Sequence, residues 1–248
     1  MTTDRPWALV TGGARRLGRA LVDAAAAEGF AVAVHANRSV EAGQVTVADL
    51  ESRGVPACLI TADLANGEEA AGLIPRLAAK GKMPRLLVNN AALFTHDRLG
   101  TATAEGFDAH MALNLRAPLL LARAFAEALP AEGEGQIVNM IDQRIHRNSP
   151  HFLTYTMAKA GLWTLTRLLA VDLAPRIRVN GIGPGIALPE EGMSPARAEA
   201  LVADYPLAHG GSVEEVAAAF RYLLDAGSVT GQMICVDGGA HLAVPGAS

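Results

Sequence analysis

The sequence has few cysteines, no surplus of positive charge and no long hydrophobic run. Its two cysteines, Cys58 and Cys235, lie far apart in apolar stretches, which favours reduced core thiols over a disulfide framework. With 21 basic and 25 acidic residues, the chain has no excess of positive charge to neutralise nucleic acid or an anionic membrane. No uncharged apolar stretch reaches the length of about 18 residues that a membrane-spanning helix requires. We therefore expect a small-molecule substrate and neither nucleic acid nor a membrane as a partner.

The sequence also lacks a secretory signal and an internal boundary. Residues 1–5 are polar and run directly into an apolar segment, without the basic, apolar and small-residue regions of a signal peptide. This pattern predicts a cytoplasmic protein. No Pro/Ser/Gly-rich linker, internal repeat or low-complexity tract divides the 248 residues, so we expect a single domain over residues 1–248.

Short apolar runs alternate with longer Ala- and Leu-rich helical patterns. Parallel strands need crossovers of a dozen or more residues, so this alternation predicts a Rossmann-type, doubly wound α/β sheet of about seven parallel strands flanked by helices. The expected strands are Trp7–Val10, Ala31–Val34, Ala57–Ile60, Arg85–Asn89, Gln136–Ile141, Arg178–Gly181 and Gln232–Val236.

Glycine and proline punctuate an irregular stretch from Gly181 to Pro195. It includes residues 189–193 and precedes a helical pattern over Pro195–Asp204. Loops of this length often form lids or binding segments. The alternative is a variable surface excursion.

A glycine-rich turn follows the first expected strand directly. Residues 11–18 read Thr-Gly-Gly-Ala-Arg-Arg-Leu-Gly, and a helical pattern begins at Leu17. Glycines permit close approach to the backbone, and a helix N-terminus offers free N–H groups and partial positive charge to a pyrophosphate. The position of the turn predicts a dinucleotide-binding site.

The segment after the second expected strand favours NADP(H) over NAD. An NAD-binding protein usually has an acidic residue here to hold the ribose 2′-hydroxyl, and His35-Ala36-Asn37-Arg38-Ser39 has none. Arg38 can pair with a 2′-phosphate, Asn37 and Ser39 can donate to it, and Arg15 lies on the same side. The alternative is that Arg38 is solvated and Ser39 caps the next helix.

Tyr155 and Lys159 stand one helical turn apart, so a helix places both on one face. A nearby ammonium favours phenolate and would lower the pKa of the tyrosine, easing proton transfer. Such a pair alone is more often an ordinary helix surface.

Together these features resemble the short-chain dehydrogenase/reductase family over essentially the whole chain. The matching segments are Thr11–Gly18, Asp63-Leu64, Asn89–Ala91, Asn114, Tyr155 with Lys159, Arg178–Asn180, Pro184-Gly185 and Asp237–Gly239. The resemblance implies hydride transfer at a nicotinamide, with Tyr155 as proton donor, Lys159 on the nicotinamide ribose and Asn114 supporting a proton relay. Asp63 would meet the adenine. The expected cofactor-binding residues are Gly12, Arg15, Arg16, Leu17, Gly18, His35, Asn37, Arg38, Ser39, Asp63, Leu64, Asn90, Ala91, Tyr155, Lys159, Pro184, Gly185 and Ile186.

Asp142 departs from the family pattern. Most members carry a serine 13 residues before the catalytic tyrosine, where it hydrogen-bonds the substrate carbonyl, and here that residue is Asp142. An ionised carboxylate only accepts hydrogen bonds, so it suits a substrate with N–H groups better than a ketone. The alternative is a member with an altered serine position that reduces another substrate or none.

Arg16 and Phe94 also depart from the pattern, and with Asp142 they resemble the pteridine reductases. In that subfamily the arginine replaces a glycine of the turn, and the phenylalanine sandwiches a flat pterin against the nicotinamide. Bacterial dihydromonapterin reductases share the aspartate. Phe94 could equally be a core aromatic at a strand end. The resemblance implies NADPH-dependent reduction of a C=N bond in a dihydropterin or dihydrofolate-like substrate.

Two other functions stay open. One is an NADPH-dependent ketone reductase, such as a 3-oxoacyl-carrier-protein reductase, and the other is a protein that binds NADP without turnover. The histidines show no metal-site spacing, and His146 and His151 are expected at the substrate mouth. Family membership implies a homotetramer in which the helices carrying Asn114 and Tyr155 pack between subunits.

Overall fold

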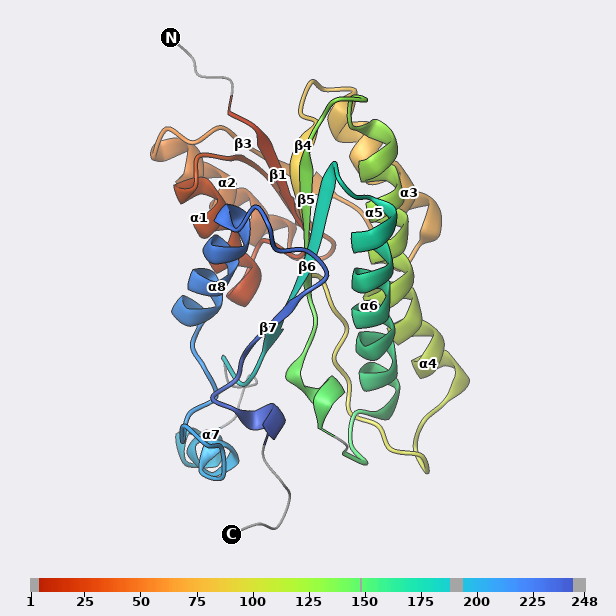
Figure 1. Ribbon diagram of the computed structural model, residues 1–248, viewed down its shortest axis with the longest axis vertical. Helices are drawn as coiled ribbons and strands as arrows, with labels where there is room; N and C mark the ends of the chain where they lie inside the picture. Colours follow the sequence, from red (N-terminus) through yellow and green to blue (C-terminus); the bar gives the residue numbers. More distant parts are fainter. Residues whose placement is uncertain (1–4, 148, 188–193, 243–248) are drawn as a thin grey trace.

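The strands of this protein all run in the same direction, because every pairing in the sheet of the computed structural model is parallel. The structure describes residues 5–147, 149–187 and 194–242. Seven strands lie in the order β3-β2-β1-β4-β5-β6-β7, which confirms the expected doubly wound sheet (Figure 1). The strands are β1 (Trp7–Val10), β2 (Ala31–Ala36), β3 (Ala57–Thr61), β4 (Pro84–Asn89), β5 (Gly135–Met140), β6 (Ile177–Pro184) and β7 (Met233–Val236).

Helices cover both faces of the sheet (Figure 1). On one face lie α1 (Arg16–Ala27), α2 (Val40–Ser52) and α8 (Val213–Asp225). On the other lie α3 (Gly67–Ala78), α4 (Ala104–Met111), α5 (Ala117–Ala128) and α6 (Leu153–Asp172). A π-helical turn, η1 (Ala112–Arg116), joins α4 to α5, and 3₁₀ turns form η2 (Gln143–His146) and η3 (Ala240–Leu242). The helix α7 (Pro195–Val202) lies beyond the carboxyl ends of the strands (Figure 1).

The hydrophobic core has two layers, one on each face of the sheet. Neighbouring residues of a strand point to opposite faces, so Val10 of β1 joins the layer under α1 and α8 while Leu9 joins the layer under α3 and α5. Every residue of β2 is buried, as expected of a strand covered on both faces. The apolar runs of the sequence therefore predicted the strands well.

The strand boundaries predicted from the sequence differ from those in the structure mainly by a few residues at the ends. Strand β2 continues to Ala36 and β6 to Pro184, beyond the expected ends, because both stay paired with a neighbouring strand there. The segment expected to be a lid includes residues 189–193, which lie outside the described residues. Both cysteines are free thiols on strands, as expected, although each is partly rather than fully buried.

The strand order reverses between β1 and β4, and this reversal places the site. The chain moves outward from β1 to β3, then returns to the other side of β1 to form β4. Loops that follow β1 and β4 diverge at such a point and leave a crevice at the carboxyl ends of the strands.

No helix in the described ranges is long and apolar enough to cross a membrane.

Candidate active site

The turn after β1 is tight enough to require glycine. Gly12 has a positive φ of 62°, and a Cβ on Gly18 would lie 2.0 Å from the carbonyl oxygen of Gly12. Arg16 also takes a left-handed conformation, with φ at 52°, which a residue with a side chain adopts less easily than glycine. The turn therefore brings the N-terminus of α1 close to the carboxyl end of β1.

His35 supports this turn from the end of β2. Its Nδ1 accepts the backbone N–H of Gly12 at 3.1 Å, and its Nε2 lies 3.1 Å from the carbonyl oxygen of Ala62. Since a carbonyl only accepts, the proton belongs on Nε2. Burial lowers the pKa of His35 to about 4, so the ring is neutral at pH 7. His35, predicted as a cofactor residue, can shape the turn but brings no positive charge to a phosphate.

Asn90 ties the end of β4 to the same turn. Its Nδ2 donates to the carbonyl oxygens of Thr11 at 2.9 Å and Gly12 at 3.2 Å. The Thr11 hydroxyl oxygen accepts the backbone N–H groups of Asn90 and Ala91. The strands on the two sides of the crevice are thus fixed relative to each other.

A hollow of about 420 Å³, here called the turn hollow, lies over this region. Ten of the residues predicted to bind the cofactor line it: Gly12, Arg15, Arg16, Leu17, Gly18, His35, Asn37, Leu64, Asn90 and Ala91. Its position over a glycine turn and a helix N-terminus suits a dinucleotide.

Arg38, Ser39 and Asp63 do not line the turn hollow. Asn37 connects to this group, because its Nδ2 donates to Asp63 Oδ1 at 3.3 Å. Ser39 occupies the N-cap position of α2, but its side chain makes no capping hydrogen bond. Arg38 is exposed beside it. The alternative is therefore right in that Arg38 is exposed and Ser39 is the N-cap residue, but the Ser39 hydroxyl does not provide a capping hydrogen bond.

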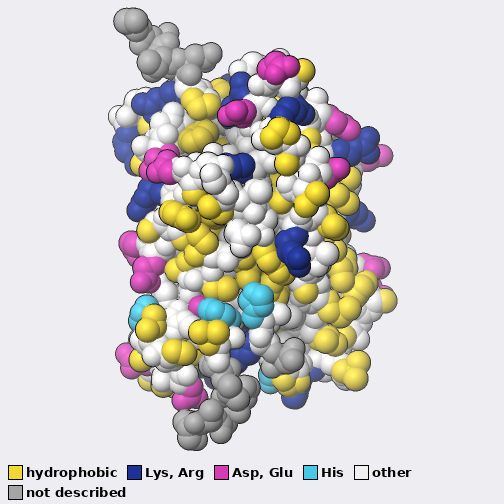
Figure 2. All heavy atoms as spheres, viewed as in Figure 1, with side chains coloured by type: hydrophobic (Ala, Val, Ile, Leu, Met, Phe, Trp, Pro, Cys, Tyr) yellow, Lys and Arg dark blue, Asp and Glu magenta, His cyan; other side chains and the backbone are white. Residues whose placement is uncertain are grey.

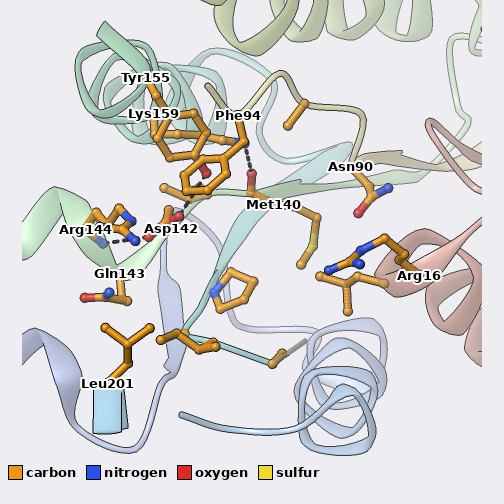
Figure 3. A pocket seen from close by; sticks show the side chains of 17 residues that line it. Arg16, Asn90, Phe94, Met140, Asp142, Gln143, Arg144, Tyr155, Lys159 and Leu201 are labelled. Carbon is orange, nitrogen blue, oxygen red and sulfur yellow. Dashed lines mark hydrogen bonds between the residues drawn. The ribbon is translucent and has the colours of Figure 1, made fainter. Parts of the chain in front are cut away.

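A second hollow, of about 340 Å³ and here called the main hollow, adjoins the first and contains the predicted chemistry (Figure 3). Arg16, Leu17 and Asn90 line both hollows. The other predicted residues that line the main hollow are Phe94, Asp142, Tyr155, Lys159, Pro184, Gly185 and Ile186.

The hydroxyl of Tyr155 donates to Asp142 Oδ2 at 2.9 Å. The other carboxylate oxygen, Oδ1, accepts the backbone N–H of Arg144 at 2.8 Å. Lys159 Nζ donates to the carbonyl oxygen of Met140 at 2.6 Å and lies on the same helix as Tyr155 (Figure 3). The end of β5 and the first turns of α6 therefore deliver a carboxylate, a phenol and an ammonium to one hollow.

Burial dominates the acid–base properties of these three groups. It raises the pKa of Asp142, although the N–H and charge of Arg144 and the Tyr155 hydroxyl oppose this. Burial and the charge of Asp142 raise the pKa of Tyr155 well above its usual value. Burial lowers the pKa of Lys159 to about 8, with Asp142 opposing. The prediction that Lys159 would lower the tyrosine pKa is wrong, because burial and then the charge and hydrogen bond of Asp142 raise it.

Asn114 holds the loop after β4. Its Nδ2 donates to the carbonyl oxygen of Leu93 at 2.9 Å, and its Oδ1 accepts the Leu93 N–H at 2.8 Å. The π-helical turn η1 carries it, and its side chain is buried. The residue beside Leu93 is Phe94, so Asn114 fixes the backbone that presents this ring.

An aromatic pair forms one wall of the main hollow. The rings of Phe94 and Phe152 stack with centroids 4.3 Å apart, and Phe94 meets Tyr155 edge-on at 4.7 Å. Phe94 is 39% exposed, so it is not the core aromatic of the alternative reading. Phe152 has φ at 58°, a strained backbone for an aromatic residue. It immediately precedes α6, so this bend sets the direction in which the helix presents Tyr155.

A buried polar network braces the aromatic wall against α6. Asp97 accepts the N–H of Thr154 at 3.3 Å and its hydroxyl at 2.5 Å. The Thr154 oxygen also lies 2.8 Å from Nδ1 of His110, whose Nε2 is 3.0 Å from the hydroxyl of Thr95. The carboxylate of Asp97 thus caps α6 from a distant segment, in place of a local capping side chain.

Sequence reasoning missed Gln143, Arg144, Phe152 and Asp97. The first two line the main hollow, and the only available signal was their position next to Asp142. His146 and His151, expected at the substrate mouth, do not line the main hollow. His151 instead lies 2.8 Å from His96, from Nδ1 to Nε2, next to Phe152.

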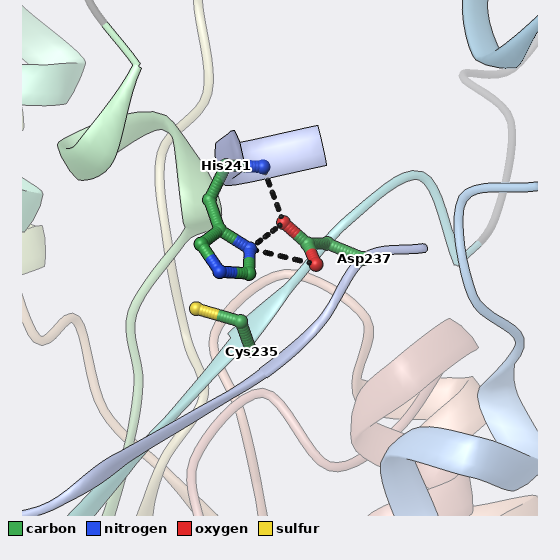
Figure 4. A group of neighbouring side chains, drawn as sticks. All are labelled: Cys235, Asp237 and His241. Atoms are coloured by element: carbon green, nitrogen blue, oxygen red, sulfur yellow. Dashed lines mark hydrogen bonds and ion pairs between the residues drawn. The ribbon is translucent and has the colours of Figure 1, made fainter. Parts of the chain in front are cut away.

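A second cluster lies at the end of β7 (Figure 4). Ligand atoms of Cys235, Asp237 and His241 lie within 4.8 Å of one another, which is compatible with a metal ion. However, Asp237 already accepts the N–H groups of Gly239 and His241 and lies 2.8 Å from the His241 ring. Burial and nearby carboxylates raise the pKa of Cys235 to about 11, which keeps the thiol protonated at neutral pH. These hydrogen bonds are typical of a structural contact, in which Asp237 holds η3 in place.

The sequence profile of a family described as "Enoyl-(Acyl carrier protein) reductase" matches residues 12–241. A 3-oxoacyl-[acyl-carrier-protein] reductase from Synechocystis is 33% identical over 94% of this chain and 95% of its own length. Bovine L-xylulose reductase is 34% identical over 94% of this chain and 95% of its own length.

Two solved structures have the same fold at higher identity. A structure of FolM alternative dihydrofolate reductase 1 from Brucella canis, complexed with NADP, matches with a TM-score of 0.89 and 42% identity, covering 99% of this chain and 97% of that one. The corresponding protein from Brucella suis, also in complex with NADP, matches with a TM-score of 0.88 and 42% identity over 96% of both chains.

The lowered pKa of His35 predicts a pH-dependent stability. Between the ordinary pKa of 6.5 and the folded value of about 4, the unfolded state binds the proton and the folded state does not. Folding should therefore lose up to about 3 kcal/mol as the pH falls through this window. In His35→Gln, whose amide can still accept and donate, this slope should disappear. Urea unfolding at several pH values measures the difference, and parallel slopes for both proteins would contradict the assignment.

Proposed function

The chain belongs to the short-chain dehydrogenase/reductase family, and on that premise we propose that it is an NADPH-dependent reductase of the C=N bond of a dihydropterin or dihydrofolate-like substrate. The observation that carries the proposal is the 2.9 Å hydrogen bond between Tyr155 and Asp142 inside the main hollow. A carboxylate at this position complements a substrate that presents N–H groups. The Brucella structures at 42% identity, described as alternative dihydrofolate reductases with NADP, support it.

The residues present fit NADP(H). The turn hollow offers the N-terminus of α1 to the pyrophosphate, and Gly12 and Gly18 leave room for close approach. Arg38 and Ser39 lie at the start of α2, and the Ser39 hydroxyl makes no capping hydrogen bond there. Arg38 would pair with the 2′-phosphate, with Arg15 on the same side. Lys159, which lines the main hollow, would hold the nicotinamide ribose.

Two neighbouring groups suit a nitrogen heterocycle. Besides Asp142, the buried Gln143 lines the main hollow, and its Oε1 accepts no hydrogen bond from the described residues. Leaving such an acceptor unsatisfied costs about 1–3 kcal/mol. A ligand N–H would offset that cost. Phe94 offers a flat surface on which a pterin ring can stack.

The proton and the hydride reach the substrate from different sources. When bound, the nicotinamide supplies hydride to the carbon of the C=N bond. Tyr155, kept protonated by its raised pKa, donates its phenolic proton to the nitrogen. Asp142 orients the phenol by accepting its hydrogen bond. A proton from solvent then restores the tyrosine, so each cycle consumes one NADPH and one proton.

Reduction of ketones is the competing activity, because acyl-carrier-protein and sugar reductases are among the relatives. A ketone needs a donor at position 142 to polarise its carbonyl. An ionised Asp142 cannot donate, although its raised pKa brings the protonated form closer to neutral pH. The existing bond from Tyr155 makes Asp142 an acceptor and favours the pterin. Binding of NADP without turnover is disfavoured by the complete set of Asn114, Tyr155 and Lys159.

Substitution of the catalytic pair tests the reaction. The protein should oxidise NADPH with dihydrobiopterin or dihydromonapterin. Tyr155→Phe removes the proton donor and should lower kcat by about 100-fold or more, and Asp142→Ala should also cause a sharp loss. Initial rates of NADPH oxidation measure both effects, with NADPH binding as the control for folding.

Asp142→Ser separates the two substrate classes. It should abolish turnover of pterins, whereas in a ketone reductase it should improve turnover of ketones. Tight NADPH binding without turnover of any pterin would contradict the proposed reaction.

The coenzyme preference should depend on Arg38. Arg38→Ala should raise KM for NADPH by about tenfold, because it removes a charge-assisted hydrogen bond to the 2′-phosphate, and should leave KM for NADH nearly unchanged. Arg53→Ala, which removes an exposed arginine at the C-terminal end of α2, is the matched control. Equal changes in the two KM values would show that Arg38 does not recognise the 2′-phosphate.

We also propose that the protein works in the cytoplasm as a homotetramer. Large hydrophobic side chains remain exposed on α5 and α6: Leu119, Met157, Leu168 and Val171, the last 81% exposed. Figure 2 shows hydrophobic side chains gathered over this side of the molecule. Light scattering of the purified protein should give about four times the mass of the chain. A monomer at micromolar concentration would contradict the assembly.

A further inference from the structure

Arg144 offers the main hollow a guanidinium with no hydrogen-bond acceptor among the described residues. It lines the hollow next to Asp142, and its hydrogen bonds use its backbone: its N–H donates to Asp142 and its carbonyl oxygen accepts the N–H of Arg147. Within the described ranges, its side chain makes no hydrogen bond or salt bridge, and its guanidinium lies over the rings of Phe152 and Phe94. The guanidinium therefore keeps its five N–H donors for a ligand.

Several other arginines of the chain do find acceptors within the protein. Arg19, Arg53 and Arg123 pair with carboxylates. Arg116 and Arg178 donate to backbone carbonyls. A partly buried guanidinium without such a partner gives up some of its hydration, and an anionic ligand would offset that loss.

The aromatic wall holds the Arg144 side chain in place. Its Cζ lies 4.6 Å from the ring centroid of Phe152 and 5.6 Å from that of Phe94. A cation–π contact uses the face of the guanidinium and leaves its edge free for two parallel hydrogen bonds to a carboxylate or phosphate. The side chain is thus oriented before a ligand arrives, which reduces the entropy lost on binding.

Further basic groups gather beside it. His96 contacts Phe152 at 5.0 Å and lies 2.8 Å from His151. Desolvation and then the positive charges of Arg98, His96 and Arg144 lower the pKa of His151, so these charges lie close to one ring. The nearest carboxylates are engaged, Asp97 by Thr154 and Asp142 by Tyr155.

The position of Arg144 separates it from the cofactor. Figure 3 shows Arg16 and Arg144 at opposite ends of the main hollow, with Asp142 and Phe94 between them. Arg16 also lines the turn hollow, whereas Arg144 borders a different neighbouring hollow together with Arg147 and Ser149. An anion at Arg144 would thus belong to the substrate and not to the dinucleotide.

We propose that the substrate carries an acidic substituent, a carboxylate or a phosphate, which Arg144 binds with support from Arg98 and the His96–His151 pair. The proposal rests on the function proposed above and narrows it to dihydropterins with an anionic side chain. The ring would stack on Phe94 and meet Asp142, and the substituent would leave the hollow past Arg144.

Three dihydropterins with the same ring test the proposal. Dihydromonapterin has a neutral side chain, dihydrofolate carries carboxylates, and dihydroneopterin phosphate carries a phosphate. Arg144→Gln should raise KM for a substrate with an acidic side chain by about tenfold, the usual value of a hydrogen bond to a charged group, and change KM for dihydromonapterin much less. Arg98→Gln should act in the same direction and more weakly. Arg53→Gln, at the C-terminal end of α2 and outside the lining of both hollows, is the matched control and should change neither value.

Comparison of dihydrofolate with dihydroneopterin phosphate shows whether Arg144 binds a carboxylate or a phosphate. The substrate with the preferred group should show the larger increase in KM in Arg144→Gln. An equal change for all three substrates, or a change in kcat alone, would overturn the proposal, because Arg144 would then act on Asp142 and Tyr155. Calorimetric binding of folate and of unsubstituted pterin gives a readout independent of turnover. If no dihydropterin is reduced, the proposed function fails, yet a tenfold loss of folate affinity in Arg144→Gln would still uphold the anion site. Unchanged folate affinity would overturn it.

Discussion

The hydrogen bond between Tyr155 and Asp142 is the constraint around which the site is arranged. A carboxylate that loses hydration must find donors, and among the described residues those of Asp142 are the Tyr155 hydroxyl and the N–H of Arg144. Both donors depend on backbone geometry, one at the end of β5 and the other in the first turns of α6. The bond therefore forms only if the sheet and the helix are held in a fixed relation.

Several features far apart in sequence maintain that relation. Asp97 caps α6 and connects it to the loop of Phe94, while Asn114 fixes the backbone at Leu93. Phe152 has a strained left-handed backbone conformation, and this bend sets the direction in which α6 begins. The positions of the catalytic side chains thus depend on buried polar contacts. Loss of one of these contacts would leave a buried donor or acceptor without a hydrogen bond, which costs stability.

The same environment controls the chemistry. Burial keeps Tyr155 protonated and raises the pKa of Asp142, so the phenol can donate a proton while the carboxylate orients it. Basic groups are distributed around this pair, with Arg16 near the dinucleotide turn and Arg144 at the other end of the hollow. The carboxylate sits between positive charges, a distribution suited to substrates that combine N–H groups with an anionic side chain.

The sequence by itself determined the parallel sheet, the glycine turn and the placement of Tyr155 and Lys159 on one helix face. These features depend on local patterns: apolar runs, glycine at a tight turn and a spacing of four residues. Asp142 could also be found, since its distance from Tyr155 and its place after a strand are visible in the chain.

Only the tertiary structure decided that His35 supports the turn, that Asp97 caps α6 and that the Arg144 guanidinium finds no hydrogen-bond acceptor among the described residues. It also showed that the pKa of Tyr155 is raised and not lowered as expected, because burial and Asp142 govern it. The reason is physical: these properties arise from contacts between segments that are remote in sequence, and the strand order alone brings those segments together.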